Sequence, residues 1–203
     1  MFSIIEAAGW PIWPLIIASV IALAIIGERL WSLREGAVMP KNLLMQTVQE
    51  YQQNGASAQS LARIAGTSPL GQVLAAGIKN IKSPPAVLKE SIEEAGRGAA
   101  IDLERFLTTL GTIAAISPLL GLFGTVVGMI EIFGSSSPSG NSNPTQLAHG
   151  ISIALYNTAY GLVVAVPSMV FYRHFRAKVD NLLVDMEMQS TKLVEIIHGE
   201  RQL

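Results

Sequence analysis

The segment Gly150–Leu162, GISIALYNTAYGL, places polar side chains in a stretch that is otherwise apolar. The polar residues are Ser152, Tyr156, Asn157, Thr158 and Tyr160. Apart from His149, no charged residue occurs between Ile132 and Tyr172. Lipid offers hydroxyl and amide groups no partner, so such groups either bond to neighbouring helices or line a water-filled path. These residues alone leave both alternatives open.

Helical periodicity sorts these side chains into sectors. At about 100° per residue, one sector of the helix carries Ile153, Tyr156, Asn157, Tyr160 and Val164. Thr158 lies more than a right angle away from Ile153, beside Ala154 and Gly161. Three spans of one chain cannot enclose a lumen, so a water-filled path would require a ring of several copies.

A second group of residues points to close helix packing. Gly121 with Thr125, and Gly124 with Gly128, form two pairs of small residues four positions apart, which let membrane helices approach closely. Close packing is therefore the expected role of the three glycines. Pro118 removes one helical hydrogen bond and is expected to favour a kink.

The elements that carry these residues are membrane spans. Half of the 203 residues are hydrophobic, only 14% are charged, and the mean hydropathy is +0.41. Three runs satisfy the length of about 20 apolar residues that a bilayer requires, Ala7–Gly27, Phe106–Ile130 and Leu147–Tyr172. The first run lacks the basic start and small-residue cleavage site of a signal peptide, which favours an uncleaved helix.

The distribution of basic residues predicts an orientation. All Lys and Arg lie between Arg29 and Arg105 or from Arg173 onward, so these parts are expected on the cytoplasmic side. The N-terminus is then expected outside. This divides the chain into an outer N-terminus with the first span (1–33), a cytoplasmic helical insert (34–105), the second span (106–133), an outer loop (134–146), the third span (147–172) and a cytoplasmic tail (173–203).

The parts outside the membrane are also expected to be helical, which makes the fold all-α. Apolar spacing and turn residues predict helices over Pro40–Asn54, Ser57–Ala65 and Pro69–Ile81. No clear stop signal follows Pro85, so a continuous helix over 85–133 is expected. Apolar residues recur along one face of the tail, which predicts an amphipathic extension of the third span that packs on its own insert alone or also on neighbouring subunits.

The sequence gives no sign of an enzyme. Cysteine is absent, and His149, His174 and His198 are too dispersed to form a metal site. The glycines at 121, 124 and 128 lack the Lys-Ser/Thr of a phosphate loop. We therefore expect no cofactor, no metal and no catalytic residue, and the net charge of −1 gives no argument for nucleic-acid binding.

Two stretches resemble a known family. SPLLGLFGTVVGM (117–129) and GISIALYNTAYGLVVAVP (150–167) are similar to the second and third spans of the ExbB/TolQ/MotA proton-channel family, most closely ExbB and TolQ. The resemblance extends over the whole chain, including its three spans and large insert. It implies a pentamer in the bacterial inner membrane, with two single-span ExbD- or TolR-like subunits in the pore and a TonB- or TolA-like protein that carries work to the outer membrane.

The resemblance also implies roles for individual residues. The two pore-lining threonines of the family map onto Thr125 and Thr158, and an aspartate of the partner span carries the protons. Asn157, Tyr156, Tyr160 and Ile153 are further candidates for the proton path. The sequence cannot separate an ExbB-like role in iron-siderophore uptake from a TolQ-like role in envelope maintenance.

One position departs from the family pattern. Relatives usually have glutamate where this chain has Ile153, and no other acidic residue lies within the third span. One hypothesis is that the complex conducts protons with the partner's aspartate as the sole titrating group. The other is a non-conducting scaffold. The retained threonines and the polar sector favour conduction.

Overall fold

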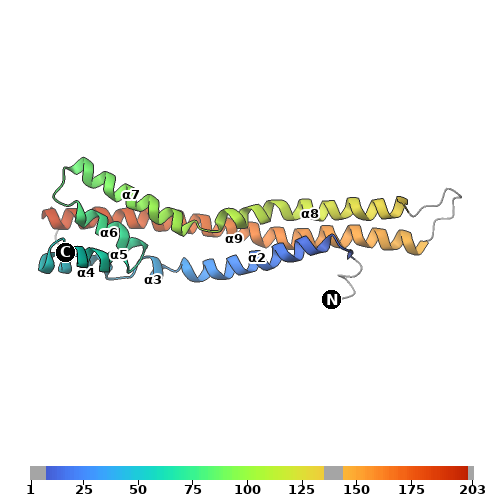
Figure 1. Ribbon diagram of the computed structural model, residues 1–203, viewed down its shortest axis with the longest axis horizontal. Coiled ribbons are helices and arrows are strands. Elements are labelled where there is room, and N and C mark those ends of the chain that lie inside the picture. Colours follow the sequence, from blue (N-terminus) through green and yellow to red (C-terminus); the bar gives the residue numbers. More distant parts are fainter. Residues whose placement is uncertain (1–7, 135–143, 201–203) are drawn as a thin grey trace. The chain divides into compact units, whose positions relative to one another are not determined.

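The computed structural model describes residues 8–134 and 144–200, and the regular elements in this part of the chain are all helices (Figure 1). They are α2 (Ile12–Ser32), α3 (Glu35–Val38), α4 (Leu43–Asn54), α5 (Ala58–Ala65), α6 (Pro69–Lys79), α7 (Pro85–Leu103), α8 (Leu107–Gly134) and α9 (Pro144–His198). The all-α prediction is confirmed. Most of the expected outer loop, 134–146, lies outside the described residues, and α9 already begins at Pro144.

Three of the described helices are long and apolar enough to cross a membrane, as predicted: α2, α8 and the Leu147–His198 part of α9. Their outward side chains include Leu119, which is 62% exposed, and Val163, which is 66% exposed. Burial of such side chains in an apolar surrounding such as lipid is favourable. The third span and the tail form one helix of 55 residues.

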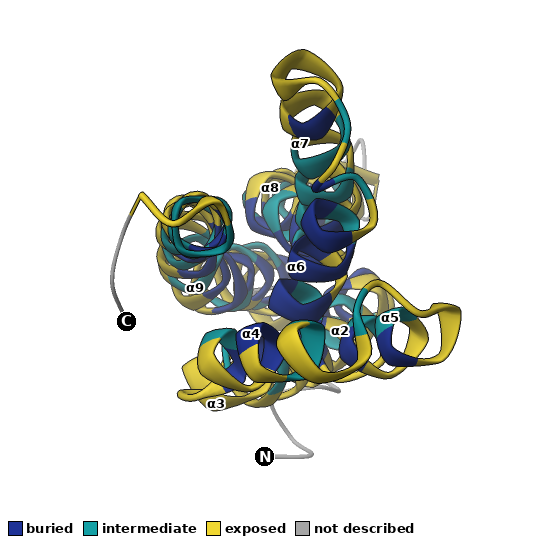
Figure 2. Ribbon diagram, turned by 90° about the vertical axis from the view of Figure 1, so that its left-hand side faces the viewer, coloured by how far each residue is buried: buried dark blue, intermediate teal, exposed yellow. Residues whose placement is uncertain are grey.

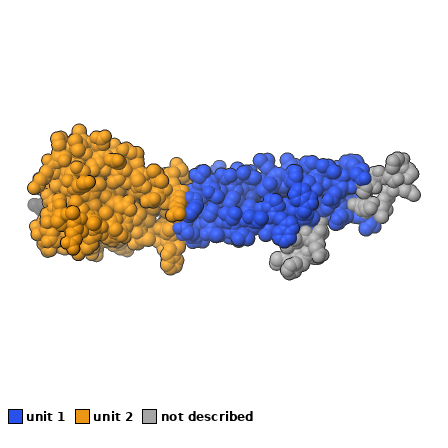
Figure 3. All heavy atoms as spheres, viewed as in Figure 1, with its two compact units in different colours: residues 1–28, 106–174 blue, residues 29–105, 175–203 orange. Residues whose placement is uncertain are grey.

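The chain divides into two compact units (Figure 3). Unit 1 contains residues 1–28 and 106–174, and unit 2 contains residues 29–105 and 175–203. Within unit 2, α6 packs against α5 and α7, and most of its residues are buried (Figure 2). A Cβ on Gly77 of α6 would lie 3.5 Å from Ile92 of α7 and 3.7 Å from Leu193 of α9. The buried face of the tail thus packs on its own insert, as both alternatives predicted.

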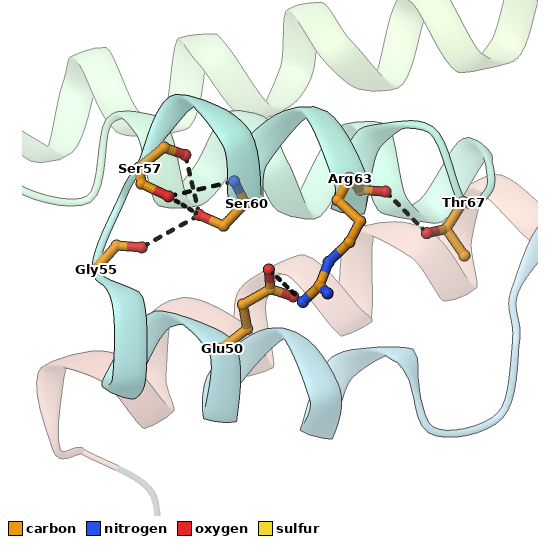
Figure 4. A network of polar contacts seen from close by, with 6 residues as sticks. All are labelled: Glu50, Gly55, Ser57, Ser60, Arg63 and Thr67. Atoms are coloured by element: carbon orange, nitrogen blue, oxygen red, sulfur yellow. Dashed lines mark hydrogen bonds and ion pairs between the residues drawn. The ribbon is translucent and has the colours of Figure 1, made fainter.

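Polar contacts fix the short helices of unit 2 (Figure 4). The Oγ of Ser57 accepts a hydrogen bond from the backbone amide of Ser60 at 3.2 Å, which caps the start of α5. The guanidinium of Arg63 on α5 lies 2.6 Å from the carboxylate of Glu50 on α4. This hydrogen bond and the charge of Glu50 raise the pKa of Arg63. Because Arg63 is exposed, we expect the ion pair to orient the two helices more than to stabilise them.

The prediction of one continuous helix over 85–133 is wrong. Helix α7 ends at Leu103, and α8 begins at Leu107 after Phe106, whose φ of 62° interrupts the helix. The buried guanidinium of Arg29 donates to the carbonyl oxygen of Leu103 at 3.1 Å and so provides a cation at the C-terminus of α7. A tertiary contact from another helix therefore stabilises this break.

Candidate site between the membrane helices

Within unit 1, α8 and α9 are antiparallel neighbours that meet through small residues. A Cβ on Gly128 would lie 2.6 Å from the carbonyl oxygen of Gly150, and one on Gly161 would lie 2.7 Å from that of Ser117. Such distances leave no room for a methyl group. The two backbones approach this closely only because glycines occupy these positions.

The glycines predicted for packing all lie on this interface. A Cβ on Gly121 would lie 2.8 Å from the carbonyl oxygen of Asn157, and one on Gly124 would overlap the Asn157 side chain. Helix α8 continues through Pro118 from Leu107 to Gly134. Helical periodicity placed Thr158 beside Ala154 and Gly161, but it did not predict that this face of α9 packs on α8. The four-residue spacing of Gly150, Ala154 and Thr158 could have revealed that role.

Thr158 lies at the α8–α9 interface and is partly buried. Its hydroxyl donates to the carbonyl oxygen of Ala154 at 3.2 Å, one turn earlier on α9. A longer contact of 3.4 Å reaches the carbonyl oxygen of Gly121 on α8. The hydroxyl therefore lies against the close contact of the two helix backbones, and its oxygen can still accept a hydrogen bond.

Thr125 lies on α8, directly after Gly124 in the sequence. Its hydroxyl donates to the carbonyl oxygen of Leu122 in the same helix at 2.6 Å. The side chain lines a shallow, mainly apolar groove together with Met129 and Phe133 of the same helix. A hydroxyl whose proton is satisfied by its own helix can still accept a hydrogen bond from water or from another chain.

Asn157 and Ile153 are interior residues of unit 1. Asn157 has no exposed surface and Ile153 is 2% exposed. The amide nitrogen of Asn157 donates to the carbonyl oxygen of Ala8 at 2.7 Å and to that of Ile153 at 2.8 Å. A Cβ on Gly9 would lie 3.6 Å from the Ile153 side chain. The segment around Ala8 and Gly9 thus packs on this face of α9.

The two tyrosines of the polar sector differ in their surroundings. Tyr160 is partly buried, and its hydroxyl lies 3.3 Å from the hydroxyl of Ser19 on α2. Tyr156 is 40% exposed. The structure therefore brings Ile153, Asn157 and Tyr160 together with residues 8–19. Thr158 lies instead beside the glycines of α8. The predicted role of these residues in a proton path stays a prediction.

The spans carry few ionisable groups. The sequence has no Asp or Glu in residues 7–27, 107–130 or 144–172. Glu131 lies near the end of α8. Among the described residues, no group of three His, Asp or Glu side chains is placed to hold a metal ion. The polar groups described between the spans are hydroxyl, amide and carbonyl groups, which form hydrogen bonds.

A helical membrane protein with a glycine-packed pair of spans is the class that this fold and site define. The model of the MotA/TolQ/ExbB proton channel family matches residues 65–188, which is more than half of the chain. The chain therefore belongs to this family. The matched region contains α6–α8 and most of α9, including both threonines.

Individual relatives are similar over most of their length. The biopolymer transport protein exbB1 of Vibrio cholerae is 31% identical over 172 residues, which cover 81% of this chain and 74% of the relative. The Tol-Pal system protein TolQ of Pseudomonas aeruginosa is 28% identical over 199 residues, which cover 90% of this chain and 86% of the relative. The ExbB of Aquifex aeolicus is 35% identical over 99 residues, which cover 49% of this chain and 62% of the relative.

Proposed function

We propose that this chain is an ExbB-like subunit of a bacterial inner-membrane motor. The motor uses the proton gradient to energise outer-membrane transport through a TonB-like protein. The observation that carries the proposal is family membership over residues 65–188 together with the similarity to exbB1 of Vibrio cholerae, a protein named for biopolymer transport. The glycine-packed α8–α9 pair supplies a rigid wall for such a channel.

The proton-carrying acid belongs to a partner in this proposal. Five copies of the chain surround single spans of ExbD-like subunits, and an aspartate on those spans takes up and releases protons. The proposal follows from the absence of Asp and Glu from residues 107–130 and 144–172. A carboxylate in lipid is costly unless polar groups accompany it, and Thr158 and Thr125 are the nearest candidates for that role.

The proposed orientation places the N-terminus in the periplasm and unit 2 in the cytoplasm. All Lys and Arg lie between Arg29 and Arg105 or beyond Tyr172, and an excess of these residues marks cytoplasmic segments. Labelling of single cysteines in intact cells tests this directly, because the chain contains no cysteine of its own. Cysteine placed at Lys41 should react only after the cells are permeabilised.

A TolQ-like role in envelope maintenance is the second candidate, since TolQ of Pseudomonas aeruginosa matches 90% of the chain. The two roles can be distinguished in cells that lack their own ExbB-type and TolQ-type proteins. These cells would receive this chain together with its single-span partner subunit. Restored growth on iron-siderophores supports the ExbB-like role. Restored detergent resistance without siderophore-dependent growth would contradict it.

Replacing Thr158 with valine is expected to lower iron-siderophore uptake several-fold while the complex still assembles. Valine keeps the branched shape but removes the hydroxyl that bonds to the carbonyl oxygens of Ala154 and Gly121. Uptake of radiolabelled siderophore and the yield of purified complex are the two measurements. The matched control is Thr112→Val, whose hydroxyl bonds within its own helix. Normal uptake by the Thr158 variant would assign the residue to packing alone.

A further inference from the structure

The side chain of Asn157 joins distant parts of unit 1 through two hydrogen bonds to backbone carbonyl groups. Its amide nitrogen donates to Ile153 one turn away and also to Ala8, which is 149 positions away in the sequence. Both amide protons are therefore used. Its carbonyl oxygen is buried and makes no hydrogen bond within the described chain, so Asn157 acts here as a donor.

The carbonyl of Ala8 is the kind of group that needs such a donor. Ala8 is followed by Gly9, whose φ is 69°, and α2 begins only at Ile12. A buried backbone carbonyl that precedes a helix lies outside its ladder of hydrogen bonds and needs another donor. Ala8 is fully buried in a part of the chain expected in lipid, where water cannot supply the missing bond.

The position of the amide is tightly confined. A Cβ on Gly124 would lie 2.6 Å from Cγ of Asn157 and 3.0 Å from its amide nitrogen. On the side of the N-terminal segment, Gly9 packs beside Ile153. Asn157 is thus held between Gly124 of α8 and the backbone of Ala8, and it cannot turn away without breaking both hydrogen bonds.

We propose that Asn157 is a positioning residue for the proton path, because its amide clamps the segment around Ala8 onto α9 and thereby fixes the turn that carries Thr158. Thr158 is the next residue, so any rotation of this turn displaces its hydroxyl from Gly121. The effect on proton flow rests on the proposed function, whereas the clamp rests only on the contacts of Asn157 with Ala8 and Gly124.

The clamp is tested by the reactivity of a cysteine at Ala8, the single thiol in an otherwise cysteine-free chain. In the assembled complex, Ala8→Cys should react slowly with a small maleimide. Adding Asn157→Leu, which keeps a side chain branched at Cγ but removes both donors, should accelerate labelling at least about tenfold. The control Ser152→Ala removes a hydroxyl that bonds only to Ala148 of its own helix and should leave the rate unchanged. An unchanged rate in the Asn157 variant would overturn the clamp.

The positioning role needs a second readout on the same variants without the added cysteine. Proton flux per assembled complex should fall several-fold in Asn157→Leu, and the pH of half-maximal flux should shift, whereas Ser152→Ala should match the parent protein. Faster labelling with an unchanged flux and pH profile would reduce Asn157 to a structural contact and overturn the positioning role. If the parent complex carried no flux, the proposed function would fail, and the labelling comparison would still decide the clamp.

Discussion

Replacing Gly124 with alanine is expected to destabilise the folded protein by about 3 kcal/mol, the upper part of the range for overpacked cores. The added methyl group would overlap the side chain of Asn157, whose Cβ and Cγ are both too close to accommodate it. The obstruction is a Cβ held by a helix backbone, so relief requires α8 and α9 to separate. Thermal unfolding of the purified protein in detergent measures the effect.

Gly27 provides the matched control for this substitution. It lies in α2, and a Cβ there would meet no atom within 4 Å. Gly27→Ala should leave the unfolding temperature unchanged or raise it slightly, since alanine is the better helix former. Combining Gly124→Ala with Asn157→Gly should recover part of the lost stability, because the clashing Cβ is then absent. Equal unfolding temperatures for Gly124→Ala and Gly27→Ala would contradict the packing described for α8 and α9.

Replacing Ile153 with glutamate is expected to abolish assembly or proton flux, although the family resemblance implies glutamate at this position. Ile153 is 2% exposed and packs beside Gly9. A carboxyl group there would replace apolar contacts, and the nearby amide of Asn157 already donates to the carbonyl oxygens of Ala8 and Ile153. Burial of an unpaired charge costs several kcal/mol, so yield and flux should both fall to near background.

Ile153→Met is the control for this second substitution, because an apolar swap of similar volume usually costs less than about 1.5 kcal/mol. Its yield and flux should stay close to those of the parent protein. Complex yield by size-exclusion chromatography and flux in vesicles are the measurements. Normal yield with preserved or increased flux in Ile153→Glu would show that position 153 faces water in the assembled complex.

Most of the fold follows from local sequence signals. Apolar length predicts the three spans, and Asn54-Gly55 and Gly66 mark the ends of α4 and α5 where the structure places them. The break after Leu103 is the exception. No proline or glycine occurs between Leu103 and Leu107, and Arg29, which donates to the carbonyl oxygen of Leu103, is far away in sequence. Local signals could not reveal a contact of that kind.

Part of the candidate site could likewise be predicted from local sequence signals. The spacing of Gly121, Gly124 and Gly128 identifies the packing face of α8, because small residues four apart share one side of a helix. Periodicity also groups Asn157 with Ile153. It cannot say which neighbour covers them, because the segment around Ala8 reaches this face only through tertiary packing.

In the proposed function, this chain lines a proton channel but contributes no proton-carrying carboxylate of its own. The decisive measurement is proton flux into vesicles that contain the chain together with its single-span partner. We expect flux in the parent complex and its loss when the partner's intramembrane aspartate is replaced by asparagine. Flux that persists in that variant, in a complex of normal composition, would show that the partner's aspartate is not the proton carrier.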